Sequence, residues 1–257
     1  MYCHEKTYDL DELARMNLHV HTAFSHCADR AMTLPAIVSE AEKAGLDAIA
    51  LIDHDNDDRD DATVLAHVQE LRRQLGGLET RVRVIIGCEL SCYDIGKTLE
   101  GDRLRQALDY RAYALNHYHM PFWAQPDEPG PRGYACHMLA MARSLIVSGK
   151  ADCLVHPLDA GYARNRIGAA AVSQANTAIT DQEMGELFEL AIEHEVAIEL
   201  NVSGILAADK PQLRRLYDIG RETGVWFNYG NDAHRLPDIA TRPALARVKR
   251  YLLGDAP

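Results

Sequence analysis

The sequence predicts an α/β fold in which parallel strands alternate with helices and close into a barrel of the TIM type. Three observations carry this prediction: short apolar runs typical of buried strands, helical periodicity between them, and a length of 257 residues, which suits one barrel domain. Seven strand-like runs are present, one fewer than a complete TIM barrel contains. Periodicity alone leaves an open doubly wound sheet as the alternative arrangement.

The predicted strands are short apolar runs bounded by polar or turn residues. Near-continuous apolar runs such as Ile49-Ala50-Leu51-Ile52 are typical of parallel strands, which are buried on both faces. In chain order the predicted strands cover residues 17–20, 48–52, 82–88, 112–116, 153–155, 197–201 and 226–229.

Helices are predicted between the strands because apolar residues recur there three and four positions apart. Thr180 and Glu183 form a capping box at the start of one helix. Gly45 and Gly224 stand where the C-caps of two other helices are expected. The apolar helical faces fall within residues 37–44, 64–75, 138–146, 184–191 and 213–220.

The chain is expected to form one domain over residues 1–257, with residues 1–16 as an N-terminal extension. Residues 121–134 are rich in proline and glycine, and we expect a loop there that is long enough to act as a lid. The six cysteines include no Cys-x-x-Cys pair, so free thiols are expected. The sequence does not indicate an oligomeric state.

Charge and hydropathy exclude several classes of partner. The net charge of −11 argues against general binding to long nucleic acid or to an anionic membrane, both of which favour a cationic surface. No signal-peptide pattern and no apolar stretch of about 18 residues is present. We therefore expect a cytoplasmic protein without a membrane partner.

The pair His19-x-His21 is the most informative local feature. If residues 17–21 form a strand, both imidazoles project from one face at its C-terminal end, which makes half of a metal site. An isolated pair of this kind would more often be structural. The metal interpretation is favoured because further histidines and carboxylates follow later apolar runs.

Those further residues lie at the C-terminal ends of predicted strands, where a loop begins. In a parallel barrel all such positions lie at one end, where active sites are built. Imidazole and carboxylate ligands suit Zn, Mn or Fe, and Glu89 has two oxygens with which it could bridge two ions. The residues in question are Asp53, His54, Glu89, His156, Asp232 and His234.

Taken in order, these motifs resemble those of the PHP (polymerase and histidinol phosphatase) superfamily. The resemblance runs from about residue 17 to about residue 240, and the segment Glu199–Gly204 is similar to the histidinol-phosphatase branch. It implies a distorted seven-stranded β/α barrel that holds two or three divalent ions of Zn, Mn or Fe. The chain departs from the family at Asn17, where an aspartate is usual.

Carried over residue by residue, the resemblance also implies a ligand set. His117 and His119 compete for one position, and His117 is preferred. The sets implied for three ions are His19, His21, Glu89 and Asp232; Glu89, His156 and His117 or His119; and His26, His54 and His234.

The function implied is that of a metal-dependent phosphoesterase that hydrolyses a small phosphomonoester through a metal-activated hydroxide. Glu89, Asp232 and His234 would lie at its catalytic centre, and Arg164 and Arg166 are candidates to clamp the phosphate. The alternatives are a phosphodiesterase or nuclease acting on nucleotides, a metal-dependent amidohydrolase, and a non-catalytic metal-binding module. Asp53 is a candidate to orient a ligand, whereas His4, His67, His137 and His194 are expected to be structural or surface residues.

Overall fold

The computed structural model describes residues 2–56, 60–206 and 211–254, and within them the predicted barrel is confirmed. Seven strands pair in parallel in the order β1-β2-β3-β5-β6-β7-β8, and the short β4 pairs with β3 in the antiparallel sense. The strands are β1 (Met16–Val20), β2 (Ala48–Leu51), β3 (Arg83–Asp94), β4 (Lys97–Thr98), β5 (Tyr110–Ala114), β6 (Cys153–Leu154), β7 (Ala197–Asn201) and β8 (Phe227–Gly230).

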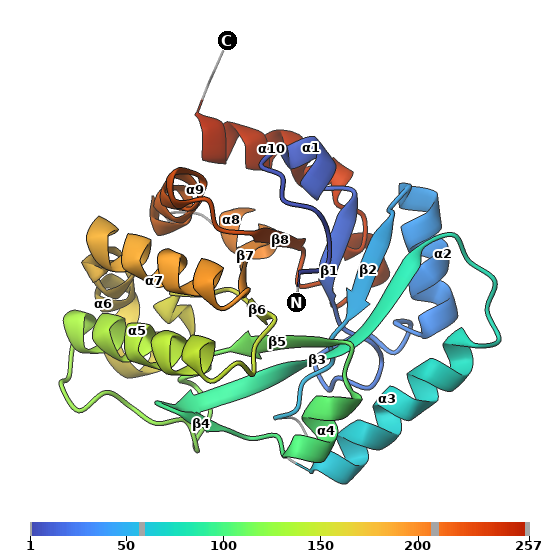
Figure 1. Ribbon diagram of the computed structural model, residues 1–257, viewed down its shortest axis with the longest axis horizontal. Coiled ribbons are helices and arrows are strands. Elements are labelled where there is room, and N and C mark those ends of the chain that lie inside the picture. Colours follow the sequence, from blue (N-terminus) through green and yellow to red (C-terminus); the bar gives the residue numbers. More distant parts are fainter. Residues whose placement is uncertain (1, 57–59, 207–210, 255–257) are drawn as a thin grey trace.

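The barrel closes between its first and last strands, which lie side by side in Figure 1. Val20 and Ala233 form a parallel bridge directly beyond β8. The Ala233 amide donates to the His19 carbonyl over 3.0 Å, and the His21 amide donates to the Ala233 carbonyl over 2.9 Å. This pairing joins the two ends of the sheet and rules out the open doubly wound alternative.

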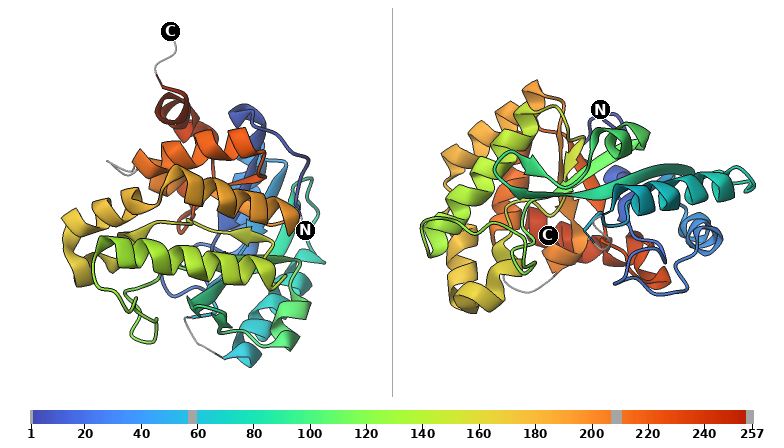
Figure 2. Two further views of the ribbon diagram at one scale, coloured as in Figure 1. Left: turned by 60° about the vertical axis from the view of Figure 1, so that its left-hand side comes forward. Right: turned by 90° about the horizontal axis from the view of Figure 1, so that it is seen from below.

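Helices surround the strands on the outside of the barrel, as the views in Figures 1 and 2 show. The predicted capping box at Thr180 and the left-handed C-cap at Gly45, with φ of 68°, are both present. No helix within the described ranges has the length and apolar character needed to cross a membrane. The helices are α1 (Leu10–Leu13), α2 (Leu34–Ala44), α3 (Asp61–Leu75), α4 (Asp102–Ala107), α5 (Pro131–Val147), η1 (Ala160–Ala163), α6 (Arg164–Ala178), α7 (Asp181–Glu193), α8 (Val202–Leu206), α9 (Pro211–Thr223), η2 (Leu236–Asp238) and α10 (Arg242–Leu253).

Strand β3 is longer than the sequence pattern predicts, and it changes partner along its length. Residues 83–86 pair with β2, whereas residues 87–91 pair with β5. At the change, Gly87 lies so close to β5 that a Cβ atom would stand 2.2 Å from the Tyr110 carbonyl oxygen. Glu89 therefore lies inside a continuing strand and not after its end, although it is level with His54 beyond β2.

The candidate lid is only partly a loop. Residues 121–130 are irregular, but α5 already begins at Pro131, because proline suits the first turn of a helix. Trp123 is buried, and its ring centroid lies 5.4 Å from that of His117. The loop thus packs beside a candidate metal ligand, and its role as a lid stays a prediction.

The segment before β1 packs against the barrel near β8. The Tyr2 ring stacks on Trp226 with centroids 4.0 Å apart, and Leu10 and Leu13 of α1 are buried. The His4 imidazole is also within hydrogen-bond distance of the Phe227 carbonyl. These contacts make the extension part of the packed structure at this end of the sheet.

Candidate metal centre

The first group of ligands forms around the HxH pair of β1. His19 and His21 are both fully buried, and their Nε2 atoms lie 3.1 Å apart. Asp232 Oδ1 lies 3.4 Å from His19 Nε2 and 3.2 Å from His21 Nε2. Glu89 Oε2 completes the group at 3.4 Å and 3.5 Å from the same two nitrogens. Four ligand atoms that are far apart in the sequence thus converge on one point.

The second group shares Glu89 through its other oxygen. Glu89 Oε1 lies 3.0 Å from His156 Nε2 and 3.6 Å from His117 Nε2. His117 is buried, whereas His119 is exposed, with its ring centroid 5.5 Å from that of His117. The structure therefore brings His117, the preferred candidate, to the carboxylate that both groups share.

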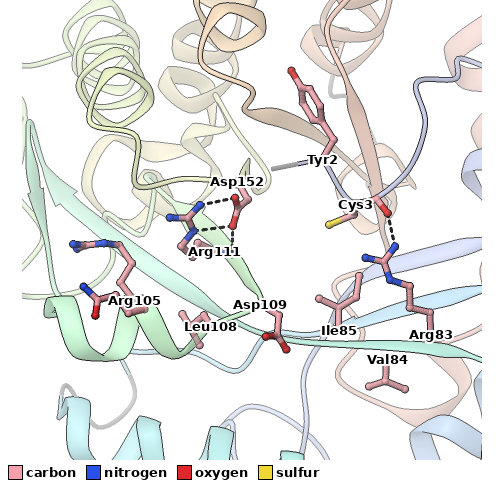
Figure 3. Close-up of a pocket in the computed structure, with 11 residues that line it drawn as sticks. Tyr2, Cys3, Arg83, Val84, Ile85, Arg105, Leu108, Asp109, Arg111 and Asp152 are labelled. Carbon is pink, nitrogen blue, oxygen red and sulfur yellow. Dashed lines mark hydrogen bonds and ion pairs between the residues drawn. The ribbon is translucent and has the colours of Figure 1, made fainter.

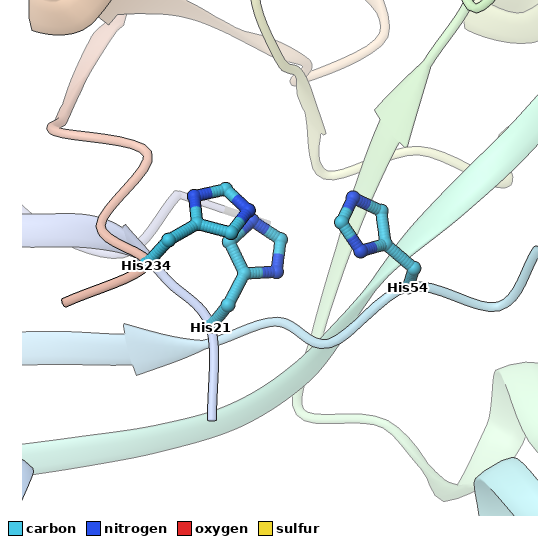
Figure 4. A group of neighbouring side chains, drawn as sticks. All are labelled: His21, His54 and His234. Atoms are coloured by element: carbon cyan, nitrogen blue, oxygen red, sulfur yellow. The ribbon is translucent and has the colours of Figure 1, made fainter. Parts of the chain in front are cut away.

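The third group consists of His21, His54 and His234, whose imidazoles gather at the ends of β1, β2 and β8 (Figure 4). The ring centroid of His21 lies 4.4 Å from that of His54 and 4.2 Å from that of His234. The side chain of Cys27 also lies here, with its Sγ 3.7 Å from His54 Nδ1.

The structure does not place His26 in any of these groups. His26 is exposed on the turn after β1, and the four sets of clustered ligand atoms found among the described residues do not contain it. Its neighbour Cys27 faces His54 instead. Partial burial alone would raise the pKa of the Cys27 thiol, but hydrogen bonds with His234 and His54 lower that pKa to about 7.

Two candidate ligands have backbone conformations that are uncommon for residues with side chains. His156 has φ of 31° and Asp232 has φ of 54°. Such conformations cost on the order of 1 kcal/mol each and are concentrated at functional sites. The fold thus holds both residues in place where an ordinary loop conformation would aim them elsewhere.

One buried carboxylate supports ligands of two groups. Glu199 Oε1 lies 2.7 Å from His19 Nδ1, and Glu199 Oε2 accepts the His156 backbone N–H over 2.5 Å. Gly230 makes room for this contact, since a Cβ atom there would lie 2.3 Å from Glu199 Oε1. When His19 donates its Nδ1 proton to Glu199, its Nε2 lone pair is free to bind a metal ion.

Amide side chains hold further parts of the centre. Asn116 Oδ1 lies 3.1 Å from His156 Nδ1, which directs His156 Nε2 towards Glu89. Asn17 Nδ2 donates to the Ile239 carbonyl, and its Oδ1 accepts the Asn231 amide over 3.0 Å. Position 17 therefore needs a donor as well as an acceptor, which an ionised aspartate could not supply.

Asp53 fixes the turn that follows the HxH pair. Its carboxylate accepts the Thr22 backbone N–H over 2.7 Å and the Ser25 hydroxyl over 2.7 Å. Ser25 Oγ in turn lies 3.4 Å from His21 Nδ1. This chain of contacts agrees with the expectation that Asp53 orients a ligand.

The electrostatics of the centre are those of mixed imidazoles and carboxylates in a buried space. Burial alone would raise the pKa of Glu89, but the surrounding histidines, His54 foremost, lower it well below its usual range. Burial alone would lower the pKa of His19, yet the carboxylates of Glu199 and Asp232 raise it well above its usual value. Burial lowers the pKa of His21 to about 3.

The donor set and an unpartnered oxygen both fit divalent cations. Glu89 Oε2 is buried and has no hydrogen-bond partner among the described residues. Such an atom is costly to bury unless a cation or a donor satisfies it. Buried imidazole nitrogens beside carboxylate oxygens are the usual ligands of zinc, manganese and iron.

A small cavity opens beside the ligands. It has a volume of about 220 Å³ and lies at the edge of the first two groups, where His156 and Asp232 face it. Tyr162 stands above them, with its ring centroid 4.8 Å from that of His117. The remaining lining residues are small or polar: Asp159, Gly161, Asn201, Ser203 and Gly204.

The two candidate arginines are placed differently. Arg166 Nε donates to the Tyr118 carbonyl over 2.6 Å, in the loop that carries His117 and His119. Arg164 begins α6, and both arginines are exposed. The structure thus brings Arg166 close to the second group of ligands.

A larger cavity of about 540 Å³ lies at the opposite end of the barrel, near the starts of β3 and β5 (Figure 3). Its charged groups already have partners inside the chain. Arg111 forms a bidentate pair with Asp152, and Arg83 donates to the Cys3 carbonyl. This cavity is separate from the ligand groups.

The family follows from a comparison with known proteins. A family model described as the PHP domain matches residues 17–203, which is more than half of the chain. The chain belongs to the PHP domain family. The predicted superfamily is thereby confirmed, and the matched residues of the PHP domain include the HxH pair, Glu89 and His156.

Relatives of this PHP domain include a curated protein of Escherichia coli described as "Probable phosphatase YcdX". The two are 26% identical over 231 residues, which cover 85% of this chain and 78% of the relative. A Shigella flexneri protein with the same description matches to the same extent.

A solved structure shares the fold. It is the histidinol phosphate phosphatase HisK of Lactococcus lactis, in complex with zinc, L-histidinol and phosphate. The TM-score is 0.56 at 14% identity, and the match covers 91% of this chain and 93% of that one. The similarity shows that the two chains have the same barrel architecture.

Sequence reasoning misses some residues of the PHP domain's centre. Glu199 and Asn116 act through contacts with histidines more than 35 positions away, which no local motif reveals. Two signals for Glu199 exist: a lone carboxylate stands inside an apolar strand, and Glu199 opens the segment Glu199–Gly204 that resembles the family. The ligand sets found among the described residues contain none of His4, His67, His137 and His194, and His67 stacks on Phe24.

Proposed function

We propose that this protein hydrolyses a small phosphomonoester at the centre built around Glu89. The chain is a metal-dependent phosphoesterase of the PHP family, and the observation that carries the narrower proposal is the small cavity beside the shared ligand groups. A space of about 220 Å³ suits a small metabolite, whereas a nucleic acid strand requires an open and cationic groove.

We propose that two to three Zn, Mn or Fe ions occupy the centre. His19, His21, Glu89 and Asp232 would hold one ion, and Glu89, His117 and His156 would hold a second. When bound, such ions supply a water molecule of lowered pKa and neutralise the charge of phosphoryl oxygens. Three divalent ions would bring roughly +6 into this buried space. The pocket can therefore be locally cationic and attract an anion, although the chain as a whole has a net charge of −11.

Side chains around the cavity would position the substrate and determine which substrates fit. Arg166, anchored through Nε at the Tyr118 carbonyl, keeps its terminal nitrogens available to a phosphate oxygen. Tyr162 offers an aromatic surface beside His117, and Ser203 and Asn201 line the cavity with hydrogen-bonding groups. This lining suits a polar alcohol that carries a ring, and histidinol phosphate is therefore the first compound to test.

Hydrogen bonds also determine which ring nitrogens of His19 and His234 remain free to bind an ion. Glu199 accepts the Nδ1 proton of His19, which leaves the Nε2 lone pair for an ion; because, against the effect of burial, the same carboxylate raises the pKa of His19, a proton competes with the ion at Nε2. His234 lies at the less buried edge, with 29% of its side chain exposed, and its Nδ1 lies 2.9 Å from the Asp232 carbonyl, so Nε2 is the nitrogen left to bind an ion. The free thiols of the chain fit a reducing cytoplasm, which we propose as its location.

The deciding experiment is a phosphate-release assay across a panel of compounds at fixed metal. The panel contains histidinol phosphate, other phosphomonoesters, phosphodiesters, short single-stranded DNA and cyclic amides. Turnover of monoesters that vanishes with a chelator and returns with added metal would support the proposal. Cleavage of diesters alone would assign the centre to a phosphodiesterase, and hydrolysis of amides without phosphate release to an amidohydrolase.

A matched pair of variants makes the assay specific. Glu89→Gln removes a ligand shared by two groups, whereas His67→Ala removes an imidazole that stacks on Phe24 away from the centre. The proposal requires that the first variant loses monoester turnover and that the second keeps it.

A further inference from the structure

We propose that Asn56 is a positioning residue for His117, and that its side-chain amide must turn before His117 can bind an ion. The inference rests on the proposed function only in that it requires the second ion site, which His117 shares with Glu89 and His156. Asn56 lies on the turn beyond β2, two residues after His54, and it is 5% exposed.

The side chain of Asn56 lies between β3 and His117. Its Nδ2 atom is 3.1 Å from Ser91 Oγ and 3.3 Å from His117 Nδ1. Ser91 follows Glu89 by two positions and therefore faces the same side of β3. The backbone N–H and the hydroxyl of Ser91 both donate to the Asp55 carboxylate, over 3.0 Å and 2.7 Å. The amide of Asn56 thus meets the ring of His117 at a fixed place in the buried interior.

This contact determines which ring nitrogen of His117 carries the proton in the metal-free chain. The Nδ2 atom of an amide only donates hydrogen bonds, so His117 Nδ1 accepts and the proton of the neutral ring is on Nε2. Burial lowers the pKa of His117 to about 3, which keeps the ring neutral. His117 Nε2 lies 3.6 Å from Glu89 Oε1, so this proton faces a carboxylate. The nitrogen that would bind the ion is therefore occupied by a proton.

His19 and His156 are supported in the opposite sense. His19 Nδ1 faces the Glu199 carboxylate, and His156 Nδ1 faces Asn116 Oδ1 over 3.1 Å, so both partners are acceptors. The amide of Asn116 is fixed in this orientation, because its Nδ2 donates to two backbone carbonyls over 3.1 Å and 2.8 Å. The Nε2 lone pairs of His19 and His156 are thus free in the metal-free chain, unlike that of His117.

The amide of Asn56 can turn within the space that it occupies, since the oxygen and the NH₂ group have nearly the same shape. Its Oδ1 atom is buried and has no hydrogen-bond partner among the described residues. A half-turn exchanges Nδ2 for Oδ1, which can then accept the His117 Nδ1–H. The turn loses the hydrogen bond from Nδ2 to Ser91 and gains one for the unpartnered oxygen, so the two changes nearly balance.

The turn leaves the charge of His117 unchanged. The ring releases its Nε2 proton to solvent and takes up one proton at Nδ1, which frees the Nε2 lone pair for an ion. The apparent affinity of His117 for zinc is therefore reduced by the fraction of chains in which the Asn56 amide has turned. A substitution that presents an oxygen to Nδ1 in every chain should remove this reduction.

The first test measures the protonated nitrogen of His117 in the unmodified full-length chain. Imidazole ¹⁵N chemical shifts distinguish protonated, unprotonated and zinc-bound nitrogens, and His117→Gln and His156→Gln assign the signals. We expect His117 to be protonated at Nε2 in chelated protein and at Nδ1 with zinc, whereas His156 is protonated at Nδ1 in both. Chelated protein in which His117 is already protonated at Nδ1 would overturn the proposal.

The second test compares variants of the two amides by the same signals. Asn56→Leu removes both donor and acceptor, so the zinc concentration that shifts the His117 signal should rise by about 10-fold to 100-fold. Asn56→Asp presents an oxygen on either side, so it should place the proton of His117 at Nδ1 without zinc and lower this zinc concentration. Equal behaviour of these two variants would contradict the role assigned to the amide oxygen.

Asn116→Leu is the matched control, because Asn116 supports His156 as Asn56 supports His117. In chelated protein Asn116→Leu should change the His156 signal and leave His117 protonated at Nε2. Asn56→Leu should change the His117 signal and leave His156 protonated at Nδ1. A change of both signals in both variants would show a general loss of structure and overturn the specific assignment.

These outcomes separate the inference from the proposed function. The expected proton shift at His117 in a chain that releases no phosphate from any monoester contradicts only the proposed function. Hydrolysis of monoesters by a chain whose His117 is protonated at Nδ1 throughout contradicts only the inference. A His117 signal that does not respond to zinc contradicts the second ion site and, with it, the inference.

Discussion

Glu199 Oε1 lies 2.7 Å from His19 Nδ1, in a contact that is closed to solvent. The second oxygen of the same carboxylate accepts the backbone N–H of His156, so one side chain braces a ligand of the first group and a ligand of the second. Support of this kind fixes the orientation and tautomer of a metal-binding imidazole. The geometry of the two groups is therefore coupled through a residue that belongs to neither group of candidate ligands.

Replacement of Glu199 tests this coupling. Glu199→Gln keeps the shape but removes the charge that holds the His19 proton, so we expect a loss of about 10-fold to 100-fold in metal affinity or kcat/KM. Glu222→Gln, on the exposed face of α9, serves as the matched control. Titration with zinc and steady-state kinetics provide the measurement. Indistinguishable behaviour of the two variants would remove Glu199 from the support of the centre.

Loss of Glu89 should affect more than one ion. Because its two oxygens face different groups, Glu89→Gln should reduce both metal content and turnover, the latter by at least about 100-fold. Elemental analysis should find two to three ions per chain in the unmodified protein and fewer than two in the variant. His194→Ala, at the C-cap of α7, should match the unmodified protein. Less than one ion per chain in metal-replete unmodified protein would contradict the multinuclear centre.

The two arginines should separate in kinetics. Arg166→Ala should raise KM for a phosphomonoester by about 10-fold, since a charged hydrogen bond contributes roughly 1.5 kcal/mol or more. Arg164→Ala should change KM much less, because of the two arginines only Arg166 has a hydrogen bond, among the described residues, to the loop that carries His117. The measurement is the KM of both variants for one phosphomonoester. A larger rise in KM for Arg164→Ala than for Arg166→Ala would assign the phosphate contact to Arg164.

Metal-free protein should be most stable near pH 6.5. Burial lowers the pKa of both His21 and His117 to about 3, whereas the unfolded chain protonates them near 6.5. Below pH 6.5 the unfolded state therefore binds more protons, and the free energy of unfolding falls by up to about 1.4 kcal/mol per pH unit for each residue. His19 and His54 act oppositely: burial opposes their protonation, but nearby carboxylates raise their pKa values well above 6.5. Their protonated forms stabilise the folded state, and this contribution to the free energy of unfolding is lost as the pH rises through their raised pKa values.

Bound metal should change the alkaline side of this profile, because ions replace the protons that His19 and His54 would lose. The gain in stability from zinc should thus grow from pH 6.5 to pH 8 and shrink towards pH 5.5, where protons compete for the imidazoles. Urea unfolding at these three pH values, with zinc and with chelator, measures the effect. A zinc-induced gain that is constant across the range would show that the histidines do not bind the ions.

The sequence predicts the barrel well because its strands are near-continuous apolar runs, and each of the seven predicted runs overlaps an observed strand. It also predicts the end of the barrel where His19, His156 and Asp232 meet, since parallel strands share a direction. It does not reveal that β3 continues past Glu89. That continuation depends on a second partner, β5, which pairs only because Gly87 permits the close approach.

The finer parts of the centre depend on contacts that no local pattern encodes. Whether His26 or Cys27 faces the ligands is a matter of one residue on an irregular turn, where neither strand nor helix periodicity applies. Asn17 shows the same point, since its donor role exists only because the Ile239 carbonyl arrives from the far end of the chain. Alternation along a strand tells which side chains point inwards, but the folded barrel determines which of them meet.

The seam between β1 and the segment after β8 also has a consequence for the order of events during synthesis. His19 and His21 leave the ribosome early, but Asp232 and His234 emerge more than 200 residues later. Until Ala233 is available, β1 lacks the partner along its open edge that supplies two backbone hydrogen bonds. Until then a nascent chain lacks Asp232 for the first group and His234 for the third, so these two groups are complete only when the last strand closes the ring. Metal loading of these two groups would thus report the completion of the barrel.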